Sequence, residues 1–135
     1  MPILMKRFLL IFFIVFSLFL FGCEEPNGQI TLVTPEEMVT LMEMEDVQLV
    51  DVRSAKQRLQ GFIKNSQNID FNSPTFDEDI RKLDKSKPVI LYCGDGRLSS
   101  KCAKKLKDAG FIKIYDLEGG MTQWLFDDHD IEMDQ

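Results

Sequence analysis

A continuous apolar run at residues 88–92 leads directly into a cysteine, a glycine-rich turn and a helical segment. The run, Pro-Val-Ile-Leu-Tyr, is typical of a parallel strand that is covered on both faces. Gly94 and Gly96 flank Asp95 in the turn, and apolar residues then recur at helical spacing through residues 99–109. Because a strand that turns directly into a helix is the repeating unit of parallel sheets, this segment predicts an α/β fold.

The rest of the chain repeats this alternation of strands and helices. Thr34, Pro35 and Glu37 predict a helix start, since Thr34 can cap the helix and Glu37 completes a capping box. The other expected elements are strands at 47–52 and 112–115, an extended segment within 63–71, and helices at 55–60, around 76–83 and from 120 through 124. We therefore predict a mostly parallel central sheet that is flanked by helices.

The first 22 residues have the composition of a secretory signal peptide. Lys6 and Arg7 precede an apolar run at 8–21, which is short for a membrane span of about 20 residues. The run ends in a Leu-Phe-Gly-Cys sequence at Cys23, which resembles the lipobox of bacterial lipoproteins and implies lipidation of that cysteine. The alternative is an uncleaved anchor helix at 3–21. Both interpretations place the domain in the cell envelope, tethered to the extracytoplasmic face of a bacterial membrane.

The remaining chain divides into a tether at 23–29, one domain at 30–126 and an acidic tail at 127–135, which we expect to be solvated together with its His129. From Cys23 onward the chain has 14 basic and 22 acidic residues, a balance that argues against nucleic-acid binding. Three cysteines do not make a disulfide framework, and one histidine cannot build a histidine metal cluster. We expect no metal and no cofactor.

Cys93 is the candidate reactive residue, because it lies between the buried strand and the helix. Ligands of parallel sheets bind beyond the carboxyl ends of the strands. Successive backbone N–H groups of a glycine-rich turn form an anion-binding nest, and the helix adds its positive N-terminal end. Such a cradle favours the thiolate, and it would equally stabilise a persulfide or a bound oxyanion. The alternative is that Cys93 is a small buried hydrophobe at a strand end.

The residues around Cys93 resemble the active loop of the rhodanese-like sulfurtransferases. The resemblance is carried, in chain order, by Asp51-Val52-Arg53, Gly61-Phe62-Ile63, the loop 91–99, Ala109-Gly110-Phe111, Ile114-Tyr115, Leu117-Glu118-Gly119-Gly120 and Trp124. It covers roughly residues 30–126 without large gaps. The resemblance implies a three-layer fold and a sulfurtransferase in which Cys93 accepts sulfane sulfur as a persulfide.

The same resemblance implies the substrates and the groups that hold them. A small donor such as thiosulfate would supply the sulfur, and a thiol or cyanide-like acceptor would remove it. The backbone N–H groups of the loop would hold the persulfide or the donor's oxyanion, and they belong to Gly94, Asp95, Gly96, Arg97, Leu98 and Ser99. Any protein partner stays unidentified at this point.

This chain departs from the family pattern at two loop positions. Leu98 occupies the sixth loop position, where the family usually has arginine, and Arg97 stands one residue earlier. Asp95 adds a negative charge inside a loop that attracts anions. Both features argue against fast turnover of thiosulfate, and they leave room for another donor or for a catalytically weak or inactive binding module.

Several further alternatives stay open in the sequence. A phosphatase or arsenate reductase needs Cys-x5-Arg, but Ser99 stands at the arginine position. A redox role would pair Cys93 with Cys102, whose other interpretation is a small core residue. Asp51 and Arg53 are supporting residues that either shape the catalytic floor or brace the strand end.

Overall fold

The computed structural model describes residues 2–18, 22 and 27–134. The predicted lipidation site, Cys23, lies outside these residues. The described N-terminal part forms one helix, α1 (Pro2–Leu18). Within the described chain, none of the helices combines the length and the apolar character that a membrane crossing requires.

A five-stranded sheet forms the centre of the domain. Its strand order is β1-β5-β4-β2-β3, and all neighbouring strands run parallel. The strands are β1 (Gln29–Val33), β2 (Gln48–Asp51), β3 (Gln67–Asn68), β4 (Val89–Tyr92) and β5 (Lys113–Leu117). The predicted α/β class with a parallel sheet is therefore confirmed. We did not predict strand β1, because this edge strand exposes four consecutive residues and lacks a buried alternation.

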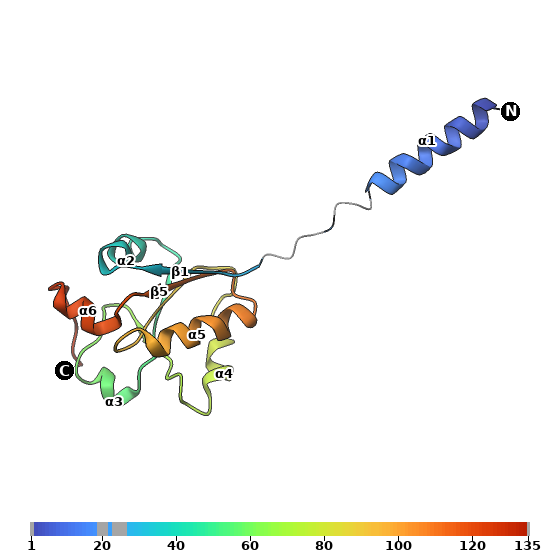
Figure 1. Cartoon of the computed structure of the whole chain (residues 1–135). Coiled ribbons are helices and arrows are strands. Elements are labelled where there is room, and N and C mark those ends of the chain that lie inside the picture. Colours follow the sequence, from blue (N-terminus) through green and yellow to red (C-terminus); the bar gives the residue numbers. More distant parts are fainter. Residues whose placement is uncertain (1, 19–21, 23–26, 135) are drawn as a thin grey trace.

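Five helices accompany the sheet: α2 (Pro35–Met42), α3 (Ala55–Arg58), α4 (Phe76–Ile80), α5 (Arg97–Asp108) and α6 (Gly120–Phe126). Two apolar clusters separate them into layers. The first joins Leu91 and Ile114 of the sheet to buried residues of α4 and α5, and the second joins Ile90 to residues of α2 and α6. Helices α4 and α5 thus cover one face, and α2 and α6 cover the other (Figure 1).

The helix starts follow local chemistry that the sequence contains. The predicted capping box is confirmed, since the Glu37 N–H donates to Thr34 Oγ1 at 3.2 Å and the Thr34 N–H donates to Glu37 Oε2 at 2.9 Å. Helix α5 begins at Arg97, two residues before the predicted start. The preceding Gly96 has a φ of 94°, a left-handed conformation that lets the chain turn directly from the loop into the helix.

The acidic tail is more ordered than we expected. Its acidic side chains are exposed, but the Phe62 N–H donates to the Glu132 carbonyl at 2.9 Å and the Glu132 N–H returns the bond at 2.8 Å. Trp124 Nε1 donates to the Asp130 carbonyl at 2.9 Å, and its ring stacks on His129. The expectation of a wholly solvated tail is therefore wrong, because these pairings join segments that no local sequence pattern relates.

Candidate functional site

Cys93 follows β4, the middle strand of the sheet, at the carboxyl edge, where β5 and β2 lie on either side of β4. The residue is 1% exposed, and the loop that begins with it enters α5 at Arg97. Its sulfur accepts the N–H of Gly96 at 3.1 Å and the N–H of Ser99 at 3.3 Å. Ser99 Oγ lies 3.4 Å from the same sulfur. Two backbone N–H groups therefore donate to one sulfur atom, and the Ser99 hydroxyl lies beside it.

The other loop N–H groups divide into free and occupied donors. Those of Gly94, Asp95 and Leu98 have no hydrogen-bond partner among the residues that the structure describes. The N–H of Arg97 is occupied, because it donates to Asp95 Oδ1 at 3.0 Å. Three loop donors thus remain available to an outer sulfur or an oxyanion, whereas Asp95 removes a fourth.

Arg97 points away from the sulfur. Its Nε lies 3.0 Å from Asp95 Oδ2, and the side chain is 89% exposed. Leu98, at the position where the family usually has arginine, is half-buried and packs against the core between the sheet and α5. The loop therefore presents no guanidinium of its own to the sulfur.

A pocket of about 240 Å³ opens beside the sulfur and is lined by Arg53, Gln57, Cys93, Gly94, Asp95 and Leu98. A second pocket, of about 270 Å³, shares Arg53, Gln57 and Gly94 with the first. It extends toward Met121, Leu125 and Ile131, which are apolar. The two pockets together form one groove that runs from the Cys93 loop to α6 and the tail.

Helix α6 holds the first part of the loop in place. The Met121 N–H donates to the Cys93 carbonyl at 2.8 Å, and the N–H and Oγ1 of Thr122 both donate to the Gly94 carbonyl at 3.0 Å. This approach requires glycine at position 120, because a Cβ there would lie 2.9 Å from the Gly94 carbonyl carbon. Gly120, the first residue of α6, therefore belongs to the support of the loop.

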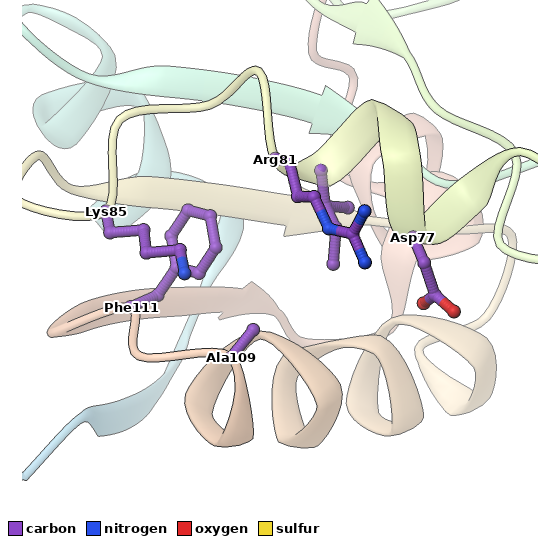
Figure 2. Close-up of a pocket in the computed structure, with 6 residues that line it drawn as sticks. Asp77, Arg81, Lys85, Ala109 and Phe111 are labelled. Atoms are coloured by element: carbon purple, nitrogen blue, oxygen red, sulfur yellow. The ribbon is translucent and has the colours of Figure 1, made fainter.

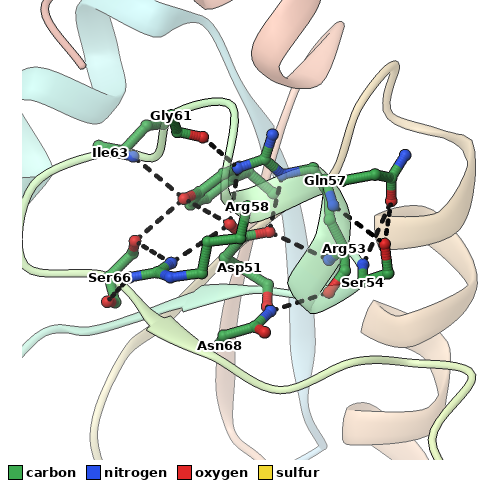
Figure 3. A network of polar contacts seen from close by, with 10 residues as sticks. Asp51, Arg53, Ser54, Gln57, Arg58, Gly61, Ile63, Ser66 and Asn68 are labelled. Carbon is green, nitrogen blue, oxygen red and sulfur yellow. Dashed lines mark hydrogen bonds and ion pairs between the residues drawn. The ribbon is translucent and has the colours of Figure 1, made fainter. Parts of the chain in front are cut away.

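Asp51 is the centre of a buried polar network beneath the groove (Figure 3). Arg53 donates to it in a bidentate manner, from Nε at 3.0 Å and from Nη2 at 2.8 Å, and also reaches the Gly61 carbonyl at 2.7 Å. Arg58 Nη1 and Tyr92 Oη reach Asp51 Oδ2 at 3.3 and 3.0 Å. The network matches the bracing role that we considered for Asp51 and Arg53, and Arg53 in addition lines the pocket.

The network also fixes the charges of its members. Burial tends to lower the pKa of Arg53, but the bonds and the charge of Asp51 outweigh it and raise the pKa above the ordinary value. Burial and the negative charge of Asp51 both raise the pKa of Tyr92. Arg53 is therefore a permanent cation, and its charge is already matched by a carboxylate.

Cys102 lies on the inner face of α5 and is fully buried. Burial raises the pKa of this thiol to about 12; the charge of Asp116 adds to the effect, and that of Lys105 opposes it. Cys93 and Cys102 are both free thiols in the structure. These observations match the core interpretation of Cys102 and do not support a redox pair.

Asp116 is a residue of this region that we did not predict. It lies within β5, is 3% exposed, and its Oδ1 has no hydrogen-bond partner among the described residues. A signal was present in the sequence, since Asp116 stands two residues after the buried Ile114 and therefore points to the same face of the sheet.

Another pocket, of about 180 Å³, lies at the opposite end of α5 from the Cys93 loop (Figure 2). Asp77, Arg81 and Lys85 surround its mouth, and Phe111 forms its apolar wall. Its lining residues include no cysteine, serine, threonine or histidine. Within the described residues there is also no group of three metal-ligating side chains. The Cys93 groove is thus the site with reactive chemistry.

Three kinds of comparison relate the chain to known proteins. The profile of the family described as Rhodanese-like domain matches residues 34–127. The tRNA uridine(34) hydroxylase of Cytophaga hutchinsonii is 36% identical over 93 residues, and the match spans 67% of this chain but only 30% of the hydroxylase. The thiosulfate sulfurtransferase GlpE of Shewanella oneidensis is 30% identical over 88 residues, which cover 65% of this chain and 85% of GlpE.

A solved structure shows the same architecture. The solution structure of the 30 kDa polysulfide-sulfur transferase homodimer from Wolinella succinogenes matches with a TM-score of 0.67 at 27% identity. The match covers 78% of this chain and 80% of that one. The likeness therefore extends over nearly the whole α/β domain.

Proposed function

Since the chain belongs to the rhodanese-like domain family, we propose that it is a sulfurtransferase that carries sulfane sulfur as a persulfide on Cys93. One observation supports this role above all others. The backbone N–H groups of Gly96 and Ser99 already point at the Cys93 sulfur, at 3.1 and 3.3 Å, in a loop that Met121 and Thr122 hold in place.

The reaction has two steps, and the loop assists both. The Cys93 thiolate attacks the sulfane sulfur of the donor, a new S–S bond forms, and the old S–S bond breaks with its electron pair leaving on the donor. An acceptor thiolate then attacks the outer sulfur of the persulfide, and the electron pair of that bond returns to Cys93. The N–H groups of Gly96 and Ser99 stabilise the thiolate at both ends of the cycle. Those of Gly94, Asp95 and Leu98 are available to the outer sulfur.

The charges around the groove favour a donor of low charge. Each arginine close to the mouth is paired with a carboxylate: Arg53 and Arg58 with Asp51, and Arg97 with Asp95. A doubly charged thiosulfate therefore meets no unpaired cation there, whereas a small alkyl persulfide carries one charge and an apolar chain. Leu98, Met121 and Leu125 offer apolar surface to such a chain. We propose that a small alkyl persulfide is the donor.

The other candidate functions have less support. A binding module without catalysis is not favoured by the sulfurtransferase relatives or by the donors that converge on Cys93. A phosphatase would clamp its oxyanion with an arginine at the position of Ser99, whose hydroxyl instead lies beside the sulfur.

The persulfide is tested by intact-mass measurement of the domain after incubation with a small alkyl persulfide or with thiosulfate. We expect a gain of about 32 Da that cyanide removes, and a larger labelled fraction with the alkyl persulfide. The Cys93→Ser variant is expected to gain nothing. The matched control, Cys102→Ser, lies in the core and should still gain the mass. If no donor adds sulfur to the wild-type protein, the proposal is wrong.

We also propose that the protein is tethered to the extracytoplasmic face of a bacterial membrane through a lipid on Cys23. The apolar helix α1, with Lys6 and Arg7 near its start, supports an N-terminal targeting segment. The full chain should appear in the membrane fraction with the mass of a lipidated N-terminal cysteine, and Cys23→Ser should abolish that mass. Recovery of an unlipidated chain that retains residues 1–22 would instead support the anchor helix.

A further inference from the structure

Arg53 has one guanidinium nitrogen that the buried polar network does not use. Its Nε and Nη2 donate to Asp51 and to the Gly61 carbonyl, whereas Nη1 has no hydrogen-bond partner among the described residues (Figure 3). Nη1 is also not enclosed, because Asp116 Oδ1 is the single buried side-chain nitrogen or oxygen atom without a partner in this part of the chain. Arg53 is only 6% exposed and lines both pockets of the groove. The free N–H groups of Nη1 are therefore directed into the groove.

A donor of this kind suits an uncharged acceptor. The charge of Arg53 is matched by Asp51 through two hydrogen bonds at 3.0 and 2.8 Å, so an anion in the groove would meet little net charge there. A backbone carbonyl is neutral, and its hydrogen bond to a guanidinium N–H does not depend on a free charge. The nitrogen therefore fits the carbonyl oxygen of a peptide chain.

Exposed apolar side chains border the far end of the groove. Leu125 and Ile131 line this end, and Phe126, which follows Leu125, is 81% exposed. Met133, two residues after Ile131, is also exposed. Apolar side chains that gather on a surface in this way are typical of contacts with another protein. This end of the groove therefore offers a surface to the apolar side chains of a bound segment.

Acidic side chains lie beside this apolar end, and their backbone is held in place. Asp130 and Glu132 flank Ile131, and both are exposed. The Glu132 N–H and carbonyl pair with Phe62, and the Asp130 carbonyl accepts the Nε1–H of Trp124. Within the described residues no acid of the tail forms an ion pair, and neither α6 nor the tail contains Lys or Arg. A segment with basic side chains is therefore complementary to this border.

We propose that the groove binds an extended segment of a partner protein, and that this segment carries the cysteine that accepts sulfur from Cys93. One backbone carbonyl of the segment accepts a hydrogen bond from Arg53 Nη1, its apolar side chains pack against Leu125 and Ile131, and its basic side chains lie beside the acids of the tail. The inference rests on the proposed function in that Cys93 carries the persulfide.

The sulfur then moves by one displacement. The cysteine thiolate of the segment attacks the outer sulfur of the Cys93 persulfide and forms a new S–S bond. The bond between the two sulfurs on Cys93 breaks, its electron pair returns to Cys93, and the segment leaves as a persulfide. The donor has already departed at this stage, so donor and acceptor use the groove in turn.

The test compares sulfur acceptors with the full chain. The probe is an acetylated and amidated five-residue peptide with a central cysteine, a leucine on each side and a lysine at each end. The comparisons are a peptide with glutamates in place of the lysines and N-acetylcysteine. Mass spectrometry follows transfer from the Cys93 persulfide at low acceptor concentration, and each rate is divided by the rate of that thiol with 2-hydroxyethyl disulfide, which corrects for thiol reactivity. We expect the lysine peptide to be about tenfold faster than either comparison.

Charge variants locate the basic side chains of the peptide. Asp130→Asn combined with Glu132→Gln removes two exposed charges and leaves the backbone pairing in place. We expect this double variant to slow the lysine peptide about threefold to tenfold and to leave N-acetylcysteine unchanged, with a weaker dependence on salt. The matched control is Glu45→Gln combined with Asp108→Asn, two exposed acids outside the groove. Equal effects of the two double variants would overturn the inference.

The apolar and carbonyl contacts have their own tests. Leu125→Ser should slow the lysine peptide about threefold to tenfold, whereas Leu32→Ser, at an exposed leucine of the edge strand β1, should not. An alkene in place of the amide before or after the peptide cysteine removes one carbonyl without any change in the protein. One of these two peptides should be about tenfold slower. N-acetylcysteine as fast as the lysine peptide would show that the acceptor is a small thiol and would overturn the inference.

Protection of Cys93 separates this inference from the proposed function. The lysine peptide with serine in place of its cysteine takes part in no sulfur transfer, and it should slow the alkylation of Cys93 by iodoacetamide, less so in the tail double variant. Such protection in a protein that gains no persulfide would refute only the sulfurtransferase proposal. A protein that forms the persulfide but shows no protection would refute only the docking of a segment in the groove.

Discussion

Arg97 and Asp95 form an ion pair at the rim of the Cys93 loop, with Arg97 Nε 3.0 Å from Asp95 Oδ2. Asp95 also accepts the backbone N–H of Arg97, so one side chain occupies two positive groups that could otherwise hold an anion. The Asp95 carboxylate therefore competes with an anionic sulfur donor for these two groups of Arg97.

Removal of the Asp95 carboxylate should increase the rate at which Cys93 accepts sulfur from thiosulfate. In Asp95→Ala, the N–H of Arg97 and its guanidinium are both released, and we expect the rate of thiosulfate-dependent persulfide formation to rise about threefold to tenfold, since exposed charge interactions are weak. In Asp95→Asn, the negative charge disappears but an oxygen remains for the N–H, so the gain should be smaller. The measurement is the initial rate at low and high salt. A gain that high salt does not reduce would argue against the electrostatic cause.

Restoring an arginine at the sixth loop position should have a larger effect. Leu98 lines the pocket beside Cys93, and in Leu98→Arg a guanidinium would stand in the loop with no carboxylate already paired to it. We expect thiosulfate to become a better donor relative to a thiol persulfide. The half-buried leucine also packs against the core, so its loss should cost about 1 kcal/mol of unfolding free energy. Leu98→Met, which keeps the apolar contact without a charge, is the control, and an equal gain in both variants would contradict the prediction.

Gly120→Ala should loosen the support of the loop. The added Cβ would approach the Gly94 carbonyl carbon to 2.9 Å, and the residue has a φ of 54°, so we expect a destabilisation of about 1–3 kcal/mol. Urea unfolding measures it. Gly94→Ala is the matched comparison for stability, because a Cβ at position 94 meets no atom within 4 Å. Equal stabilities of the two variants would show that the contact between α6 and the loop is unimportant.

Asp116 predicts a pH dependence of stability. Burial raises the pKa of its carboxyl in the folded protein above the unfolded value of about 3.9. The folded state then binds the proton more tightly, so the contribution to stability is present at low pH and is lost as pH rises through the folded pKa. Asp116→Asn cannot ionise, and its advantage over wild type in urea midpoint should therefore grow with pH above about 4. A constant difference between the two proteins at all pH values would contradict this.

Alkylation should distinguish the two cysteines of the domain. The pKa of Cys102 is about 12 and the residue lies in the core, whereas Cys93 lines the pocket at the carboxyl edge of the sheet, so iodoacetamide at pH 8 should modify Cys93 and leave Cys102 intact until the protein is unfolded in urea. Peptide mass mapping locates the label. Modification of Cys102 in the folded protein at a rate close to that of Cys93 would refute the core interpretation.

Local patterns were sufficient to predict the fold class and the position of the Cys93 loop. The apolar run at 88–92 and the capping box at Thr34 depend on neighbouring residues, and such signals are readable in a sequence. The docking of Glu132 onto Phe62 depends on residues that are far apart in the chain. Strand β1 was not predicted because it is an exposed edge strand without a buried alternation. The burial of Asp116 arises from the position of β5 between β1 and β4.

The site itself was predictable only in part for the same reason. Cys93 and its turn follow from the sequence, whereas the pocket beside them is completed by Arg53 and Gln57 from another segment. The exposed direction of Arg97 is set by Asp95, two residues away, and is a local effect. The packing of α5 against β5, beside which Asp116 is buried, could not be read from either segment alone.

The parallel sheet places the amino ends of its strands at one edge and their carboxyl ends at the opposite edge. All five strands run in one direction, so the start of β1 at Gln29 lies at the amino edge of the sheet and Cys93 lies at its carboxyl edge. The N-terminal segment enters the domain at Gln29 (Figure 1). Whatever holds that segment is therefore attached at the amino ends of the strands, and the pocket beside Cys93 lies at the opposite edge of the sheet.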